Sequence, residues 1–185
     1  MEGKILLDMD DTLYDFLGNI TDLYRRLYPE EPFVAPEDMY DNHFSKVYRE
    51  QIGHMAEERM EELFHMPELY RNLRPLPGAV EAVHEMLDEG LDVRVCTAPL
   101  RDYRHCVHEK YESLDEHFGK NLTDHLVLAR DKTAIKGDIL VDDRPRISGR
   151  YEPEWNHVLF DQPFNRHVDL PRIQSWSEWK SILKR

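Results

Sequence analysis

The sequence predicts an α/β protein whose core is a doubly wound, parallel β-sheet of about five strands, with a small helical cap inserted after the first strand. Three observations predict this fold class. Five short apolar runs are bounded by polar or turn residues, as in strands buried on both faces. Helical patterns lie between several of the runs, but about 80 residues separate the first run from the second, too many for one crossover helix. The runs are residues 4–7, 93–96, 126–129, 139–141 and 158–160.

Three segments of the predicted core repeat apolar residues at helical spacing. The first follows the turn-forming residues 75–78 and ends at Gly90, a suitable C-cap. The second covers about 102–118, and the third begins at Ser175, a suitable N-cap. Their expected buried positions are, in order, Val80, Val83, Met86 and Leu87; Tyr103, Val107, Tyr111 and Leu114; Trp176, Trp179, Ile182 and Leu183. We expect Trp155, Trp176 and Trp179 to anchor the last helix to the sheet.

The long gap after the first strand has helical patterns of its own. Its first pattern carries an apolar stripe, and two more run through residues 44–52 and 55–69. Prolines at 29, 32 and 36 separate the first two patterns. The stripe consists of Phe16, Ile20, Leu23, Tyr24 and Leu27. We therefore expect residues 14–73 to form a helical cap over the carboxyl edge of the sheet, and residues 1–13 and 74–185 to form the α/β core.

The composition excludes several classes of function. The 185 residues contain 24 Lys and Arg against 37 Asp and Glu, a formal net charge of -13. Nucleic-acid polymers and anionic membranes are therefore not expected as partners. Hydrophobic residues make up 41% of the chain, which indicates a folded core rather than a disordered acidic tail. With no expected signal peptide or spanning helix, and with Cys96 and Cys106 in neither a disulfide nor a metal-site spacing, we expect a cytoplasmic protein with reduced thiols.

Carboxylates follow two of the predicted strands at the point where each strand ends. Asp8, Asp10 and Asp11 come directly after the first run, and Asp142 and Asp143 follow the fourth. One such cluster alone is equally compatible with a capping or solvated turn. Because the carboxyl ends of parallel strands meet at one edge of a sheet, however, both clusters are expected to lie close together. Hard oxygen ligands in such a group predict a Mg²⁺ site.

Two further strand ends carry groups that suit an anion. Thr97 offers a hydroxyl and a turn of backbone amides, and Lys132 offers an ammonium group. Each residue alone has a simpler interpretation, since a threonine often forms a turn and a lysine is usually solvated. Four such groups on successive strand ends instead predict that an anionic ligand binds beside the metal.

These four groups occur in the order of the four motifs of the haloacid dehalogenase-like phosphatases, a family with a Rossmann-like fold that this chain resembles. The chain is more similar still to the 5'(3')-deoxyribonucleotidases. This resemblance is nearly letter for letter at residues 74–83, 95–99, 130–133, 142–145 and 155–160. It covers essentially the whole chain and is weakest from about residue 21 to 69.

The resemblance implies catalytic roles for the acidic residues. Asp8 is expected to be the nucleophile that forms an aspartyl-phosphate. Asp10 is expected to protonate the leaving oxygen and then to activate the hydrolytic water. The resemblance also implies that Mg²⁺ is bound by the Asp8 carboxylate, the Asp10 backbone carbonyl and Asp143, with Asp142 in support.

The resemblance further implies a phosphate site made by Thr97, the backbone amide of Ala98, and Lys132. This chain departs from the family pattern at two positions. Ala98 stands where the family usually has serine, so one hydroxyl contact to phosphate is missing. Asp11 stands where the deoxyribonucleotidases usually have glycine. An aspartate at this position is common in the wider superfamily. The second departure weakens the subfamily assignment but not the reaction type.

The resemblance also implies residues around the substrate's base and sugar. Phe16 and Tyr70 match family positions that place aromatic rings around the nucleobase. Phe16 also lies on an apolar stripe, where core packing is the alternative interpretation. Arg101, Arg130 and Arg144 lie near the motifs and are candidates for contacts to phosphate or sugar. The alternative for these arginines is pairing with surface carboxylates.

The resulting hypothesis is a Mg²⁺-dependent 5'(3')-deoxyribonucleotidase that hydrolyses small nucleoside monophosphates such as dUMP and dTMP. A phosphatase for another small ester, such as a sugar phosphate or phosphoserine, is the first alternative. A response-regulator-like phospho-acceptor or a plain Mg²⁺-binding domain is the non-enzymatic alternative. The acid–base group at Asp10 argues against the former, and Thr97 and Lys132 argue against the latter. The resemblance also implies a homodimer.

Overall fold

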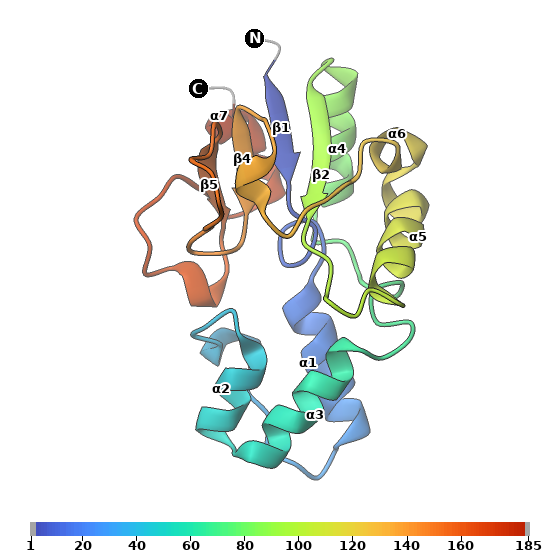
Figure 1. Ribbon diagram of the computed structural model, residues 1–185, viewed down its shortest axis with the longest axis vertical. Helices are drawn as coiled ribbons and strands as arrows, with labels where there is room; N and C mark the ends of the chain where they lie inside the picture. Colours follow the sequence, from blue (N-terminus) through green and yellow to red (C-terminus); the bar gives the residue numbers. More distant parts are fainter. Residues whose placement is uncertain (1–2, 184–185) are drawn as a thin grey trace.

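The computed structural model describes residues 3–183 and has a parallel sheet at its centre. Figure 1 shows the sheet above a separate group of helices. The strand order is β3-β2-β1-β4-β5-β6, and every neighbouring pair is parallel. The strands are β1 (Lys4–Leu7), β2 (Asp92–Thr97), β3 (Val127–Leu128), β4 (Ile139–Asp142), β5 (Asn156–Phe160) and β6 (Arg172–Ile173). The predicted α/β fold class is confirmed.

All five predicted strands are present, and the sequence analysis missed only the edge strand β6. This strand has two residues, Arg172 and Ile173, which pair with Leu159 and Phe160 of β5. A strand this short has no apolar run that periodicity could detect. At the centre of the sheet, Ile5 pairs with Val93 on one side and with Ile139 on the other, so β1 is hydrogen-bonded along both edges.

The two faces of the sheet are covered differently. One face packs against α4 (Ala79–Asp88), α5 (Cys106–Phe118) and α7 (Trp179–Leu183), with the short α6 (Lys120–Thr123) beside α5. Alternate residues of the strands, such as Leu6 and Leu140, point to the other face and form a smaller cluster with Cys96 and Trp155. No helix in the described part of the chain is long and apolar enough to cross a membrane.

The three tryptophans do not share one task. Trp176 stacks on Phe160, with ring centroids 5.2 Å apart, and its indole nitrogen donates to the carbonyl of Thr12 at 2.9 Å. Trp176 and Trp179 are both buried at the C-terminal helical segment, as expected. The expectation for Trp155 is wrong, because it lies on the opposite face. There its indole nitrogen donates to the carbonyl of Lys132 at 3.3 Å.

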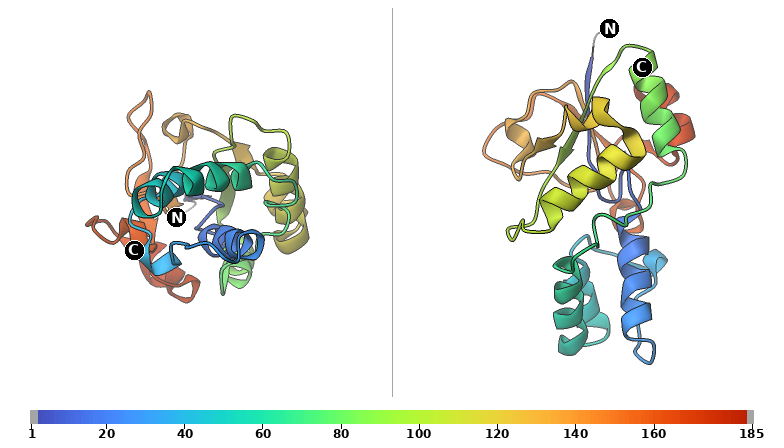
Figure 2. Two further views of the ribbon diagram at one scale, coloured as in Figure 1. Left: turned by 90° about the horizontal axis from the view of Figure 1, so that it is seen from below. Right: turned by 90° about the vertical axis from the view of Figure 1, so that its right-hand side faces the viewer.

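Three of the helices between β1 and β2 lie beyond the carboxyl ends of the strands (Figures 1 and 2). They are α1 (Phe16–Leu27), α2 (Phe44–Gln51) and α3 (His54–Phe64). On the predicted stripe of α1, Phe16, Ile20 and Tyr24 are buried, whereas Leu27 is 43% exposed. The helix expected over 55–69 ends earlier, at Phe64, and turns follow it.

The two linkers that join these helices to the sheet run side by side. Tyr14 and Pro75 form an antiparallel bridge. The backbone N–H of Asp15 donates to the carbonyl of Arg74 at 2.9 Å, and that of Leu76 donates to the carbonyl of Leu13 at 2.8 Å. The chain therefore enters and leaves the helical unit at one hydrogen-bonded point, and α1 begins only eight residues after Asp8.

The helix α5 is rotated relative to the expectation from its apolar residues. Tyr103 and Tyr111 are exposed, at 69% and 45%, although both belong to the expected buried stripe. The residues that face the protein interior instead are Cys106, Glu109, Lys110, Ser113, Leu114 and Phe118. The predicted face is wrong because Glu109 and Lys110 bury their charges against specific partners, while the tyrosines remain in contact with water.

Candidate active site

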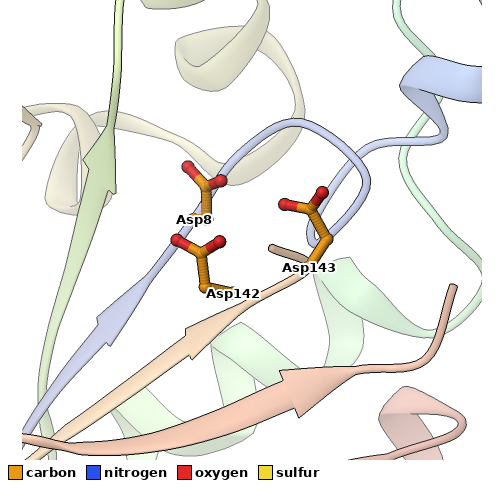
Figure 3. A group of neighbouring side chains, drawn as sticks. All are labelled: Asp8, Asp142 and Asp143. Carbon is orange, nitrogen blue, oxygen red and sulfur yellow. The ribbon is translucent and has the colours of Figure 1, made fainter. Parts of the chain in front are cut away.

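Both acidic strand ends meet at the carboxyl edge of the sheet. Asp8 follows β1, and Asp142 and Asp143 lie at the end of β4. The backbone N–H of Asp8 donates to the carbonyl of Val141 at 2.9 Å, which fixes the loop after β1 to β4. One carboxylate oxygen from each of the three aspartates lies within 4.8 Å of the others, and all three residues are buried. Figure 3 shows their carboxylates gathered at one place.

Lys132 lies against this cluster, as the strand-end pattern predicts. Its Nζ is 2.7 Å from Oδ1 of Asp8 and 2.5 Å from Oδ2 of Asp142. Burial alone would lower the pKa of Lys132, but the adjacent carboxylates raise it overall, so the ammonium stays charged. Burial would likewise raise the pKa of Asp8, yet the charges of Lys132 and Lys110 lower it. Asp8 is thereby kept ionised, as a nucleophile must be.

The remaining carboxylates of the cluster carry charge that the protein itself does not offset. Burial, followed by repulsion from Asp142 and Asp8, raises the pKa of Asp143 well above its ordinary value. The pKa of Asp142 is also raised, chiefly by burial and despite its contact with Lys132. Converging, under-compensated carboxylate oxygens of this kind fit a hard divalent cation such as Mg²⁺.

Asp10 and Thr97 lie next to this cluster, and a residue that the sequence analysis missed connects them. The Nζ of Lys110 on α5 is 2.5 Å from Oδ2 of Asp10 and 2.9 Å from Oγ1 of Thr97. Its side chain is completely buried. A signal was present in the sequence, because Lys110 lies in an i, i+4 row with Cys106, Leu114 and Phe118. A lysine in such an apolar row is a candidate for a buried ion pair.

A pocket opens from these groups toward the helical unit. Its sheet side includes Asp8, Asp10, Thr97, Ala98 and Asp143. Its other side is lined by aromatic rings that meet at Phe16. The Phe16 ring stacks with those of Tyr70, Phe64 and Phe44 at centroid distances of 5.7, 5.9 and 6.2 Å.

The pocket therefore contains both predicted aromatic residues. Phe16 is also 6% exposed and packed in the core, so this residue both lines the pocket and contributes to core packing. The sequence analysis missed Asn42, Phe44 and Phe64, which line the same pocket. These residues lie in the weakest part of the resemblance, where periodicity identifies a helix but not which of its rings faces a ligand.

The three arginines differ in their positions. Arg144 lines the pocket, and its backbone N–H donates to Oδ1 of Asp142 at 2.9 Å. Arg130 is exposed and donates to the carbonyl of Pro99 at 2.9 Å. Arg101 is exposed as well, and neither Arg101 nor Arg130 is among the residues that line the pocket. The structure thus brings one of the three predicted arginines to the site.

The backbone conformation at Asp11 favours glycine but also accommodates aspartate, the residue that this chain has in place of the family's glycine. Its φ is 53°, in the left-handed region, which aspartate tolerates better than most residues. Its Oδ1 accepts a hydrogen bond from the N–H of Leu17 at 2.7 Å, within the first turn of α1. Asp11 therefore caps α1 from the loop after β1, a contact that glycine cannot make.

The fold resembles that of solved haloacid dehalogenase-like structures. The chain superposes on a crystal structure of a haloacid dehalogenase family hydrolase from Deinococcus radiodurans R1 with a TM-score of 0.62 and 14% sequence identity. The superposition covers 98% of this chain and 94% of the other, whose structure has bound phosphate and sodium. At this identity the likeness shows the fold alone.

The groups at the strand ends, together with the family that the chain matches, define a phosphoric monoester hydrolase. Residues 3–185 match the family described as 5' nucleotidase, deoxy (pyrimidine), cytosolic type C. The cytosolic type 5'(3')-deoxyribonucleotidase of Homo sapiens is 38% identical over 97% of this chain and 92% of its own length. The mitochondrial 5'(3')-deoxyribonucleotidase of Mus musculus is 40% identical over 97% of this chain and 84% of its own length. The chain belongs to this nucleotidase family, and the predicted resemblance is confirmed.

Proposed function

We propose that the protein is a Mg²⁺-dependent 5'(3')-deoxyribonucleotidase that hydrolyses pyrimidine deoxyribonucleoside monophosphates such as dUMP and dTMP through an aspartyl-phosphate. One observation carries the proposal. The carboxylates of Asp8, Asp142 and Asp143, with Lys132 against them, form one buried cluster, and Asp8 and Asp143 of this cluster line a pocket whose opposite wall is aromatic. Such a site offers a cation and an ammonium group to a phosphate and flat apolar rings to a base.

Asp8 acts as the nucleophile in this mechanism. One of its carboxylate oxygens attacks phosphorus, a new O–P bond forms, and the bond from phosphorus to the sugar oxygen breaks. Two features support the assignment: Asp8 lines the pocket, and its lowered pKa keeps it ionised. The covalent route divides hydrolysis into two easier displacements.

Asp10 acts as the general acid and then as the general base. Its proton passes to the sugar oxygen as that oxygen leaves, so the nucleoside departs as a neutral alcohol. In the second displacement, Asp10 takes a proton from the attacking water, phosphate is released, and Asp8 and Asp10 return to their initial states. Its position two residues after Asp8, on the pocket wall, supports this role.

The phosphoryl group is held by residues at the end of β2 and after β3. Thr97 and the backbone amide of Ala98 donate hydrogen bonds to its oxygens, and Lys132 offsets charge between Asp8 and the substrate. Asp8, Asp143 and the Asp10 carbonyl, with Asp142 in support, would hold Mg²⁺. The ion would supply charge neutralisation to the phosphoryl oxygens.

The aromatic side of the pocket supports a nucleotide rather than a smaller ester. The rings of Phe16, Phe64 and Tyr70 are nearly parallel, with interplanar angles of 11° and 19° to Phe16. Stacking on aromatic side chains contributes about 1–3 kcal/mol per base. A sugar phosphate or phosphoserine has no flat ring with which to gain this energy.

The test is a substrate panel with a matched pair of variants. Phosphate release is measured with dUMP, dTMP, deoxyribose 5-phosphate and phosphoserine, with Mg²⁺ or with EDTA. We expect the nucleotides to have the highest kcat/KM, EDTA to abolish turnover, and Asp8→Asn to reduce kcat by about 10³-fold or more. Asp92→Asn is the control, because Asp92 lies at the opposite end of β2 and is 41% exposed.

Each outcome of the panel decides a separate part of the proposal. Undiminished turnover by Asp8→Asn would overturn the nucleophile. Equal or higher kcat/KM for deoxyribose 5-phosphate or phosphoserine would overturn the nucleotide preference and leave a phosphatase of other specificity. A phosphorylated protein that persists for minutes without turnover would identify a phospho-acceptor module instead.

A further inference from the structure

The buried lysine on α5 is an unusual feature of the site, because burying an ammonium group is costly without a charged partner. The Lys110 side chain is 0% exposed, and the carboxylate within ion-pair distance of it is that of Asp10. Its neighbour Glu109 points elsewhere, toward the backbone N–H groups of Glu68 and Tyr70. The Tyr70 ring covers the ammonium, with Nζ 5.3 Å from the ring centroid. Lys110 is thus directed at Asp10 rather than at the surface.

This contact leaves the two oxygens of Asp10 in different states. Oδ2 is 2.5 Å from the ammonium of Lys110. Oδ1 is buried and has no hydrogen-bond partner among the described residues. Because Asp10 lines the pocket and its side chain is 28% exposed, the carboxylate that Lys110 anchors is in a position to exchange a proton with a substrate.

The same ammonium also orients a hydroxyl. A threonine hydroxyl can accept two hydrogen bonds and donate one. Lys110 has no acceptor, so Oγ1 of Thr97 must accept from Nζ across the 2.9 Å contact. The hydroxyl proton of Thr97 is then directed away from Lys110 and remains available for a phosphoryl oxygen.

We propose that Lys110 is a positioning residue for the phosphatase reaction: it holds the carboxylate of Asp10 toward the leaving oxygen, and it holds Thr97 so that its hydroxyl donates to the phosphoryl group. The inference rests on the proposed function, in which Asp10 protonates the leaving group. It adds a second lysine to the site, on a helix rather than at a strand end, with a task different from that of Lys132.

The test separates positioning of the acid from a general loss of structure. Lys110→Met keeps an unbranched side chain as far as Cε and removes the ammonium group. We expect kcat/KM for dUMP, whose alkoxide needs a proton in order to leave, to fall by about 10²-fold or more. For p-nitrophenyl phosphate, whose phenolate leaves without a proton, we expect a fall of less than about 10-fold. The parameter kcat/KM is used because it reports only the steps up to formation of the phosphoryl-enzyme.

Companion variants make the result specific. Asp10→Ala should show the same dependence on the leaving group, and the double variant should be no slower than Asp10→Ala alone, because the two residues act as a unit. Lys136→Met is the control, since that lysine is 80% exposed. Equal losses on both substrates, or losses that multiply in the double variant, would overturn the positioning role.

A measurement on the unaltered protein covers the case in which Lys110→Met does not fold. In a crystal structure with Mg²⁺ and beryllium fluoride, Nζ of Lys110 should remain hydrogen-bonded to Asp10 and Thr97. An ammonium that instead bonds to the fluoride atoms would make it a phosphate ligand and overturn the inference. If Asp8→Asn stays active, or Asp10→Ala shows no dependence on the leaving group, the proposed function fails rather than the role of Lys110.

Discussion

In the proposed site, Ala98 provides one side-chain hydroxyl fewer to the phosphate than the serine expected from the family resemblance. It follows Thr97 and lines the pocket, so a side chain added at its Cβ is near any phosphate bound there. A neutral hydrogen bond contributes about 0.5–1.5 kcal/mol net, or about 2–12-fold in binding. A serine introduced at residue 98 therefore tests whether this wall of the pocket contacts phosphate.

We expect Ala98→Ser to lower the KM for dUMP and the inhibition constant of inorganic phosphate by about 2–10-fold, with a smaller change in kcat. Steady-state kinetics with both ligands measures this. Ala134→Ser, at an exposed alanine, is the control. A KM and an inhibition constant that both stay constant would show that residue 98 does not contact the phosphate.

At the scale of single residues, sequence reasoning identified the groups that sit at strand ends. Asp8, Thr97, Lys132 and Asp143 could be predicted because a parallel sheet brings its carboxyl ends to one edge whatever the details of packing. Lys110 could not be placed in this way. Its partner Asp10 is 100 residues away in sequence, and only the packing of α5 reveals the contact.

At the scale of elements, α5 connects Asp10 and Thr97 with the segment that leads back from the helical unit. Glu109 is 2% exposed. Its two carboxylate oxygens accept hydrogen bonds from the backbone N–H of Glu68 at 2.8 Å and of Tyr70 at 3.1 Å. One turn further, Glu112 accepts from Nε of Arg71 at 2.8 Å. The helix thus holds residues 68–71 through buried and half-buried polar contacts.

We expect Glu109→Ala to lower the free energy of unfolding by about 2–3 kcal/mol, because a charge-assisted hydrogen bond to a buried N–H is lost without replacement by water. Denaturant unfolding followed by circular dichroism measures the change. Glu116→Ala on the same helix is exposed and should change stability by less than about 0.5 kcal/mol. Equal effects of the two substitutions would contradict the contact.

The elements themselves were predicted unequally. Apolar runs identified five strands, and helical periodicity identified α1, α4 and the C-terminal helical segment. The face of α5 was assigned to the wrong residues because an apolar stripe assumes that charges stay in water. Partners distant in sequence compensate the charges of Glu109 and Lys110, so their burial cannot be derived from the helix alone.

At the scale of the whole molecule, the net charge of -13 opposes an anionic substrate. Locally, Lys110, Lys132 and Arg144 lie among the acidic groups of the site. The two effects act over different ranges. Contacts inside the site are short and poorly screened, whereas the field of the exposed acidic surface is screened by salt.

We expect kcat/KM for dUMP to rise by about 2-fold when the ionic strength increases from about 10 mM to about 150 mM, which shortens the Debye length from about 30 Å to about 8 Å. The turnover number kcat should stay constant, because the bound state is not screened in the same way. Kinetics at saturating Mg²⁺ across this range checks the expectation. A fall in kcat/KM with added salt would show that the cations of the site, and not the surface, govern the approach of substrate.

The pairing of the two linkers at Tyr14 and Pro75 has an evolutionary consequence. The core presents the same two adjacent chain ends whatever segment lies between them. The entropy of closing that segment grows only slowly with its length, so a longer, shorter or unrelated insert could replace residues 16–73 without moving a strand. In the proposed function the reacting groups lie in the core and most of the aromatic rings of the pocket lie in this segment, so new specificities can arise by replacing one part while the other is inherited intact.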